Sequence, residues 1–498
     1  MKSNRLSMAI IVMAGLVVYG RVSTAYFCGY DDFMETHRAG FEDTRYPVRI
    51  FSTTHFQSPK YRPLNRALTY LCWHLEPGSA LPFRVRNIFF HLIAALLVYA
   101  IAALFVSDNA VALTAGLLFC LDPWVNQNIT AAIFTNTAAY SALLASFLLF
   151  VRSLRSHGRG LLLVSLVLAL TGLFLYESDI VIFGMMALWL VILRLRGEAL
   201  EKSWLRVWAF GSAIILAVYS LIRHSVVTRS AGIAPFPVMV HNLIVYIAAL
   251  LSPVDVVLAH DLFGTSLPPD IHPGRRLVIW AVLAACSVLV AGLMFLLAPA
   301  GSSGLRRLDR GLVTFLILSI VMALGPVLLF TPHASETYLY LPAALYAILL
   351  AMILRAFVRN RALYASIVSL LMVSFVAGDW VRNNRVSSCA VIAQRIMNQL
   401  PTALWAKGTW NIQLAVKPGD MLPQRYGVYS YDGIATIDPS EPDTPAAERA
   451  LQLATGNERL HAAVVPAGSM QCSVPRSCFW ISANGDVREN GVRSPAPR

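Results

Sequence analysis

The stretch Ile88–Val106 (IFFHLIAALLVYAIAALFV) contains no Asp, Glu, Lys or Arg and a single histidine, His91, and it is long enough to cross a lipid bilayer as a helix. Ten similar apolar blocks lie near residues 8–22, 110–125, 131–151, 161–176, 179–195, 207–222, 277–298, 312–331, 338–356 and 362–379. Backbone amides inside hydrocarbon can be satisfied only within their own segment, so we expect each block to be a helix. The sequence therefore predicts an all-α polytopic membrane protein with about 11 transmembrane helices.

The composition of the 498-residue chain agrees with this class. Hydrophobic residues make up 57% of it and charged residues only 13%, with a mean hydropathy of +0.61. The formal net charge is +13, but the basic residues stand in short clusters between apolar blocks, as the positive-inside rule predicts. We therefore expect the chain to be surrounded by membrane lipid, and we expect no nucleic-acid partner.

The first apolar block has two interpretations. Ser23-Thr24-Ala25 resembles a signal-peptidase site, which would make residues 8–22 a cleaved signal peptide. Cleavage would separate this helix from the acidic residues that follow it, so we favour an uncleaved anchor.

The basic clusters also predict the topology. Residues 238–252 are apolar but only about 15 long, a length more typical of an interfacial or re-entrant segment. If they do not cross, the clusters near 152–159, 194–206, 306–310 and 355–361 all fall on the side of Lys2 and Arg5. The consistent model has a cytoplasmic N-terminus and an external C-terminus, and it is compatible with a bacterial inner membrane.

This topology places four polar segments on the outer face: the first loop (22–87) and residues 122–128, 176–179 and 331–338. The first loop is too long for a simple connector, and we expect it to be structured. The inner connections carry little besides arginine. The outer face is therefore the predicted working face.

An acidic pair, Asp31 and Asp32, opens the first loop. Two adjacent carboxylates can bind a divalent cation such as Mg²⁺ or Mn²⁺, or can act as a general base toward a hydroxyl. Arg62 and Arg66, later in the same loop, suit an anionic group such as phosphate. A solvated loop with ordinary ion pairs is the alternative, and spacing alone does not separate the two interpretations.

Five motifs follow one another in the chain. They are Asp31-Asp32, Tyr61-Arg62-Pro63-Leu64, Asn87 with His91 four residues later, Tyr176-Glu177-Ser178, and Glu336-Thr337-Tyr338-Leu339-Tyr340-Leu341-Pro342. Together they resemble the GT-C class of integral-membrane glycosyltransferases. Within that class they are most similar to the protein O-mannosyltransferase-like enzymes that in animals carry tetratricopeptide repeats.

The resemblance implies a glycosyltransferase of the cell envelope. Such an enzyme moves a sugar from a polyprenyl-phosphate-linked donor to a hydroxyl of a protein, lipid or glycan acceptor, inverting the anomeric configuration. Asp31 or Asp32 would be the catalytic base or a ligand of a divalent cation. The residues implied at the donor site are Tyr61, Arg62, His91, Glu177, Glu336 and Tyr338.

The chain departs from the family pattern at four places. Asp122-Pro-Trp-Val-Asn-Gln127 stands where the family commonly has His-Pro-x-His-x-Glu. Thr337 replaces an Arg, Tyr176 a Lys, and Arg84 a His. These changes affect the expected contacts to the lipid phosphate.

Several of these residues also have purely structural interpretations. His91 is equally consistent with a hydrogen-bonded residue of a helix bundle. Glu177 and Asp179 stand at a helix start, where acids are favoured by the helix dipole. Tyr338 and Tyr340 suit the aromatic belt of a membrane interface.

Residues 1–380 form the predicted membrane module and 381–498 a small outer domain of α/β or α+β type. We expect an amphipathic helix over 381–399, a helix over 444–454, and strands over 410–416, 424–431, 461–465 and 477–482. No tetratricopeptide periodicity is present. Cys472 and Cys478 are expected to form a disulfide in an external compartment.

Two other function classes remain open. A lipid-linked sugar flippase or transporter would need paired broken helices or internal repeats with charges at the midplane, which the sequence does not show. A non-catalytic protein of cell-envelope glycan assembly would be consistent with the departures from the family motifs.

Overall fold

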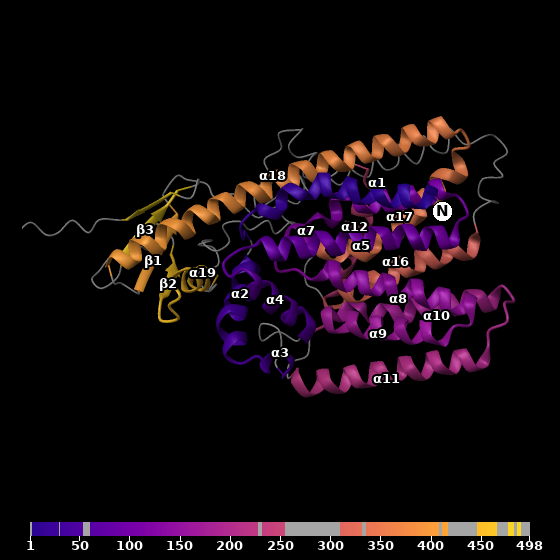
Figure 1. Ribbon diagram of the computed structural model, residues 1–498, viewed down its shortest axis with the longest axis horizontal. Coiled ribbons are helices and arrows are strands. Elements are labelled where there is room, and N and C mark those ends of the chain that lie inside the picture. Colours follow the sequence, from indigo (N-terminus) through magenta and orange to yellow (C-terminus); the bar gives the residue numbers. More distant parts are fainter. Residues whose placement is uncertain are drawn as a thin grey trace, which may run out of the picture.

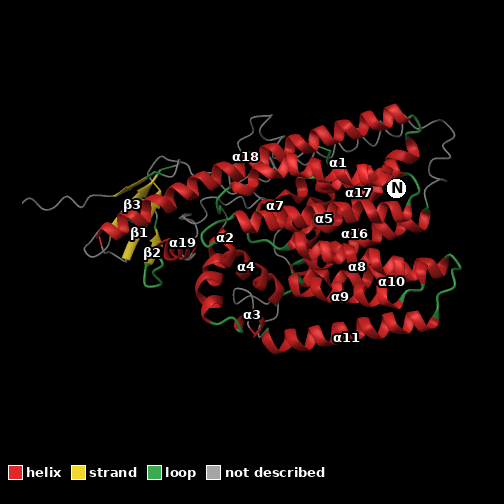
Figure 2. Ribbon diagram, viewed as in Figure 1, coloured by secondary structure: helices red, strands yellow, loops and turns green. Residues whose placement is uncertain are grey.

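The computed structural model describes residues 2–28, 30–52, 60–227, 232–253, 309–330, 335–407, 411–416, 446–465, 477–482 and 486–489. These residues form a long helix bundle, a group of short helices at one end of it, and a small sheet beyond that group (Figures 1 and 2). The long bundle helices are α1 (Lys2–Tyr19), α5 (Leu81–Phe105), α6 (Asn109–Cys120), α8 (Asn136–Ser156), α9 (Arg159–Leu175), α10 (Val181–Leu195), α11 (Lys202–Val226), α16 (Arg310–Phe330), α17 (Tyr340–Phe357) and α18 (Arg361–Lys407).

The predicted spans correspond to helices wherever the structure describes them. In the described part of the chain, 8 helices are long and apolar enough to cross a membrane. The shorter apolar helices α6 and α9 account for two further predicted blocks. The block at 277–298 lies outside the described residues. The all-α polytopic prediction is confirmed.

Two predicted blocks have different ends from those expected. The block 110–125 stops at Cys120, because Asp122 starts a new turn, η3 (Pro123–Val125), which leads into α7 (Asn126–Thr130). The block 131–151 becomes helical only at Asn136. Residues 131–135 are instead held by side chains of α5, as described below.

Helix α12 (Phe236–Leu251) corresponds to the ambiguous apolar block. Its 16 residues rise about 24 Å, which is less than the roughly 30 Å of bilayer hydrocarbon. Helix α9, with 17 residues, is almost as short and corresponds to a predicted span, so length does not decide whether α12 crosses. The side of the membrane on which each loop lies stays a prediction.

The basic connections lie together at one end of the bundle, which we call the basic end. There Arg355 pairs with Asp108 at 2.8 Å, joining α17 to the α5–α6 connection. Arg196 pairs with Asp309, joining the α10–α11 connection to the start of α16. The N-terminus is at this end (Figure 1). These basic connections and the N-terminus therefore lie at the same end of the bundle, as the basic clusters in the sequence predicted.

The opposite end, which we call the loop end, carries the first loop, and this loop is structured as predicted. It contains α2 (Tyr30–His37), the π-helical turn η2 (Arg38–Asp43), α3 (Arg49–Ser52) and α4 (Pro63–Leu75). A buried ion pair between Arg66 and Asp43 joins α4 to η2, and Arg66 also donates to the Arg49 carbonyl at 2.8 Å. Gly40 leaves room for the Trp73 ring, whose atoms would lie 3.1 Å from an added Cβ.

The C-terminal domain contains a four-stranded sheet in the order β2-β1-β3-β4. Its strands are β1 (Asn411–Val416), β2 (His461–Val464), β3 (Ser477–Ile481) and β4 (Val487–Glu489), and its helix is α19 (Ala446–Thr455). β1 pairs in parallel with β2 and β3, while β3 and β4 are antiparallel. The predicted α/β character is confirmed, β4 was not predicted, and the strand expected at 424–431 lies outside the described residues.

Helix α18 joins the two parts. It is continuous for 47 residues, so the last predicted span and the amphipathic stretch after it are one helix. It starts at the basic end and reaches the sheet (Figure 1). Leu400 and Leu404 of α18 share a core with Leu414, Leu451 and Phe479 of the C-terminal domain.

The cysteines agree with the expectation where they are described. Cys478 of β3 is disulfide-bonded, and its expected partner Cys472 lies outside the described residues. Cys28, Cys72, Cys120 and Cys389 are buried free thiols.

Candidate functional site

The structure places Asp32 in a buried position between two loop segments. Its side chain is 2% exposed. Oδ2 accepts a hydrogen bond from the Cys28 backbone N–H at 3.1 Å, and Oδ1 accepts one from Ile133 N–H at 3.2 Å. Asp31 precedes it in α2, and its side chain lies outside the described part of the structure. Asp32 thus joins the first loop to the segment after α7.

The first turns of α5 hold both of these segments in place. The buried Arg84 guanidinium donates to the carbonyls of Ala25 at 2.9 Å and Tyr26 at 2.7 Å, and also to that of Thr130. Asn87 donates to the Ala131 carbonyl at 2.8 Å. One helix start therefore fixes the two backbone segments that converge on Asp32.

Arg86 supplements this arrangement from the same helix start. Its Nη2 donates to the carbonyls of Ala132 and Phe134, each at 2.9 Å. These contacts explain why residues 131–135 form a bend and a turn and are not part of a helix. The apolar pattern of these residues gives no sign that Arg86, which stands earlier in the chain, binds their carbonyls in place of helical N–H groups.

A second part of the loop end centres on Arg62, at the start of α4. Its Nε donates to Glu177 Oε2 at 2.5 Å and its Nη2 to Glu177 Oε1 at 2.8 Å. Its guanidinium carbon lies 4.2 Å from the centroid of the Tyr176 ring. Burial alone would lower the pKa of Arg62, but the Glu177 carboxylate raises it above its ordinary value, so the side chain is a cation. Two sequence motifs far apart in the chain meet here.

The neighbouring motif residues lie close to this pair. Tyr61 donates its hydroxyl to the Phe51 carbonyl at 2.9 Å and packs edge-on against Phe174, with ring centroids 6.3 Å apart. Tyr338 lies within electrostatic range of Arg62 and Tyr176. Asp179 is fully buried, with its carboxylate against Gly172.

Glu336 belongs to a separate, fully buried network. Arg382 of α18 donates from Nη1 to both Glu336 oxygens at 2.7 Å. Nearby, Asp379 of α18 accepts from the Tyr19 hydroxyl at 2.9 Å and from Asn126 Nδ2 at 2.7 Å. This network joins α1, α7, η5 (Glu336–Leu339) and α18 at the loop end.

Sequence reasoning missed Asp379, Arg382 and Asn383. Asn383 donates to the Val18 carbonyl at 2.9 Å and accepts from Asn126 at 3.1 Å. A signal was present, because an Asp and an Arg three residues apart follow an apolar span and occupy one helix face. The prediction instead placed a domain boundary at this point.

His91 has both ring nitrogens engaged in the bundle interior. Nδ1 lies 2.8 Å from the Tyr340 hydroxyl and Nε2 lies 3.0 Å from the Cys120 carbonyl oxygen. The Tyr340 ring is itself stacked on Tyr140, at 5.2 Å between centroids. These are the contacts of a hydrogen-bonded bundle residue. A donor-site role for His91 stays a prediction.

The departures from the family motifs have local structural partners. Asp122 accepts from Trp124 N–H at 3.0 Å and so begins η3. Thr337 is buried and its N–H bonds to Ser335 Oγ at 3.4 Å. Tyr176 supplies the ring face under Arg62, and Arg84 holds the first loop.

The divalent-cation expectation is not tested by these contacts. Among the described residues, no group of three or more His, Cys, Asp or Glu side chains is arranged to hold a metal ion. The Asp31 carboxylate is outside that set. Each Asp32 oxygen already accepts a backbone N–H, as described above.

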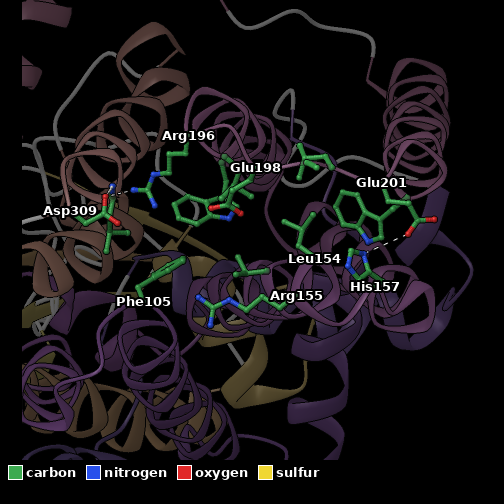
Figure 3. A pocket seen from close by; sticks show the side chains of 15 residues that line it. Phe105, Leu154, Arg155, His157, Arg196, Glu198, Glu201 and Asp309 are labelled. Carbon is green, nitrogen blue, oxygen red and sulfur yellow. Dashed lines mark hydrogen bonds and ion pairs between the residues drawn. The ribbon is translucent and has the colours of Figure 1, made fainter.

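Two cavities lie at the basic end, away from the candidate residues. One, of about 300 Å³, is lined by side chains of α8, α10, α11 and α16, including the Arg196–Asp309 pair and His157, which lies 3.6 Å from Glu201 (Figure 3). Its neighbour, of about 550 Å³, includes Asp108 and Arg355. Neither contains a residue of the sequence-predicted site.

No protein-family model matches the chain, and no curated protein matches it. The chain is similar to the crystal structure of ArnT from Cupriavidus metallidurans bound to undecaprenyl phosphate, with 14% identity over 96% of this chain and 92% of that one, at a TM-score of 0.41. It is also similar to the apo structure of that protein, with 14% identity over 86% and 83% of the two chains, again at 0.41. Similarity of this degree concerns the course of the chain, so the functional proposal rests on the side chains of this protein.

Proposed function

We propose that the protein is a membrane glycosyltransferase that moves a sugar from a polyprenyl-phosphate-linked donor to an acceptor hydroxyl. The observation that carries the proposal is the Arg62 guanidinium, which Glu177 and Tyr176 hold at the end of the bundle where the acidic helix α2 also lies. An oriented cation and a carboxylate are the two groups that such a transfer needs. Both belong to the first loop.

The reaction is a single displacement. A carboxylate of the acidic pair accepts the proton of the acceptor hydroxyl, whose oxygen attacks the anomeric carbon. The bond between that carbon and the phosphate oxygen breaks, and polyprenyl phosphate leaves with the electron pair. A cation near that oxygen stabilises the developing charge, and we assign this role to Arg62. Attack opposite the leaving group inverts the configuration.

We assign the base role to Asp31 and a positioning role to Asp32. Both oxygens of Asp32 accept backbone hydrogen bonds, and its side chain is buried, so it holds α2 against the segment at Ile133. A divalent cation at the pair is the alternative role. Activity measured before and after EDTA, with Mg²⁺ or Mn²⁺ added back, separates catalysis by a carboxylate base from catalysis that needs a divalent cation.

The proposed location is the inner membrane of a bacterium, with the loop end and the C-terminal domain in the periplasm. A polyprenyl donor dissolves in the bilayer, and its phosphate lies at the membrane surface. The loop end presents Arg62 at the ends of apolar helices, where such a phosphate would be met.

The test uses the full-length protein in membrane vesicles and a panel of synthetic undecaprenyl-phosphate sugars. Release of undecaprenyl phosphate is followed by mass spectrometry. Wild-type membranes should release it from at least one sugar donor, and Asp31→Asn membranes should not. Arg159→Gln, an exposed change at the basic end, is the matched control.

Two results would contradict the proposal. One is an unchanged release rate in both Asp31→Asn and Asp32→Asn at equal protein levels. The other is movement of an intact lipid-linked sugar across the bilayer without release, which would favour the flippase class.

A further inference from the structure

Helix α2, which carries the acidic pair, lies beside helix α19 of the C-terminal domain (Figure 1). It has eight residues, and a helix of this length is not stable alone in water. The position of α2 therefore depends on the groups that pack around it. Asp32 supplies the contact to the segment at Ile133, as described above, and α19 supplies further contacts from a part of the chain about 400 positions later.

The apolar contact between α2 and the C-terminal domain is made by Phe33. This side chain is 2% exposed and belongs to one cluster of buried residues with Ala450 and Leu451 of α19. The Phe27 ring lies in the same cluster, with its centroid 6.1 Å from that of Phe33 and 5.6 Å from that of Phe83 in α5. One apolar core therefore runs from the start of α5 through α2 to α19. Such burial is non-directional, so it holds α2 without fixing its orientation.

His37 supplies a directional contact. It stands one helical turn after Phe33, on the same face of α2, and is 4% exposed. Its Nε2 lies 3.4 Å from Nη1 of Arg449 in α19. Arg449 is oriented in turn by Gln452, whose Oε1 accepts from the same Nη1 at 3.0 Å and whose Nε2 donates to the Leu460 carbonyl at 2.9 Å. The arginine is thus held within its own domain and directed at α2.

The contact between Arg449 and His37 requires a neutral imidazole. A guanidinium has donors only, so Nε2 of His37 must be the unprotonated acceptor. Burial, and then the charge of Arg449, lower the pKa of His37 to about 4, against a weaker opposing effect of Gln452. Protonation would bring two cations together. The hydrogen bond is therefore present above this pKa and lost below it.

A second polar contact joins the same two parts of the chain. Arg45, which follows η2, pairs with Glu458 at 2.7 Å. Both side chains are exposed, and an exposed ion pair contributes little to stability. The buried contact at His37 is therefore the polar group to test.

We infer that the C-terminal domain positions the acidic helix, and that Arg449 is a positioning residue that acts on α2 through His37. The catalytic meaning of this arrangement rests on the proposed function, which assigns the acidic pair to the reaction. Asp32 binds the first turn of α2 to the segment after α7, and Arg449 binds its last residue to α19. Both ends of the acidic helix are thereby held, one by the membrane module and one by the outer domain.

The experiment follows hydrogen–deuterium exchange of the full-length protein in phosphatidylcholine nanodiscs by mass spectrometry. Peptides over residues 30–37 report on α2, and peptides over 88–105 report on α5 as the internal reference. The variants are Arg449→Met, Arg449→Glu, and Arg449→Glu combined with His37→Gln. Arg459→Gln, at an exposed arginine of the same domain, is the matched control. The kcat and the KM for the sugar donor are recorded for every variant.

Arg449→Met should raise the exchange rate of α2 and leave that of α5 unchanged. Because a small displacement of a reacting group is costly, kcat should fall by roughly tenfold or more, while the KM for the donor stays unchanged. Arg459→Gln should resemble the wild type in every measurement.

Arg449→Glu gives a signature that general destabilisation would not. A carboxylate at this position pairs with protonated His37, so it raises the pKa of that imidazole. At about pH 8 α2 should exchange faster than in the wild type, and lowering the pH to about 5.5 should restore its protection, after correction for intrinsic exchange. The wild type should show no such recovery. Adding His37→Gln should abolish the effect, because the titrating group is then absent.

Three outcomes would overturn the inference. They are unchanged α2 exchange in both Arg449→Met and Arg449→Glu, an equal rise in the exchange of α5, and a recovery at low pH that persists when His37 is replaced. The exchange measurements need no substrate, so they are separate from failure of the proposed function. A protein with the expected exchange pattern that transfers no sugar would keep the positioning of α2 by Arg449 and lose the transferase.

Discussion

Arg382 donates from one nitrogen, Nη1, to both carboxylate oxygens of Glu336 at 2.7 Å, and neither side chain is exposed. The two residues are on different helices, α18 and η5, and the ring centroid of Trp124 in η3 lies 5.6 Å from the guanidinium carbon of Arg382. The pair thus connects α18 to η5 at the loop end of the bundle. Its charges are fully desolvated, so each depends on the other.

Removal of one member of this pair should be strongly destabilising. Arg382→Met leaves the Glu336 carboxylate buried without its cation, and we expect a loss of about 3–5 kcal/mol of stability. Arg382→Met with Glu336→Leu removes both charges and should recover much of that loss. Thermal unfolding of detergent-solubilised protein measures both variants. Equal destabilisation in the single and double variants would contradict the coupling.

Removal of the acidic pair should separate two roles. Asp31→Asn should lower the transfer rate by about 10²–10⁴-fold with little change in unfolding temperature, as expected for a general base. Asp32→Asn should lower both the rate and the unfolding temperature, because its carboxylate binds two backbone N–H groups. The comparison needs only rate and unfolding measurements on the same preparations. Equal behaviour of the two variants would contradict the division of roles.

Arg84 should affect the reaction through the loop that it holds. Arg84→Lys keeps the charge but cannot reach the carbonyls of Ala25, Tyr26 and Thr130 together. We expect kcat to fall by roughly tenfold, which corresponds to about 1.4 kcal/mol, while the Kd for undecaprenyl phosphate stays unchanged. An effect on Kd alone would place Arg84 at the lipid instead.

His37 should make stability depend on pH. Burial, and then the charge of Arg449, lower the pKa of His37 from its ordinary 6.5 to about 4. The folded state therefore binds this proton less readily than the unfolded state. Stability is complete above about pH 6.5 and falls as the pH drops toward about 4, by roughly 2 kcal/mol across that window. Unfolding midpoints at pH 7 and pH 5 should differ less in His37→Gln than in the wild type.

The spans were predictable because a bilayer requires only length and apolarity, and those are local properties of the sequence. The sequence predicted that Arg62 and Glu177 lie on the same face, because both belong to donor-site motifs in loops of that face. Their bidentate pairing was not, since the residues are 115 positions apart. Asp379 and Tyr19 are 360 positions apart, and nothing local relates them.

One helix start was predicted wrongly because side chains bind distant backbone groups. The pattern at 131–135 looked helical because hydrophobicity does not report that Arg86 and Asn87 bind those carbonyls. The domain boundary at 380 was placed where polarity rises, and it stays a prediction. The helix expected after it continues the last span as α18, and its polar residues there bond to Glu336, Tyr19 and Asn126.

Because α18 is one continuous helix, it fixes the distance between the helix bundle and the C-terminal domain. Its 47 residues measure about 70 Å, with Arg382 locked in the bundle and Leu400 locked beneath the sheet. One residue inserted between these two points would lift the sheet by about 1.5 Å and turn it by about 100°. Helix α19, which shares a core region with Phe33 of α2, would then swing away from the acidic helix. The number of residues between Arg382 and Leu400 therefore sets both the height of the C-terminal domain above the bundle and its rotation about the axis of α18.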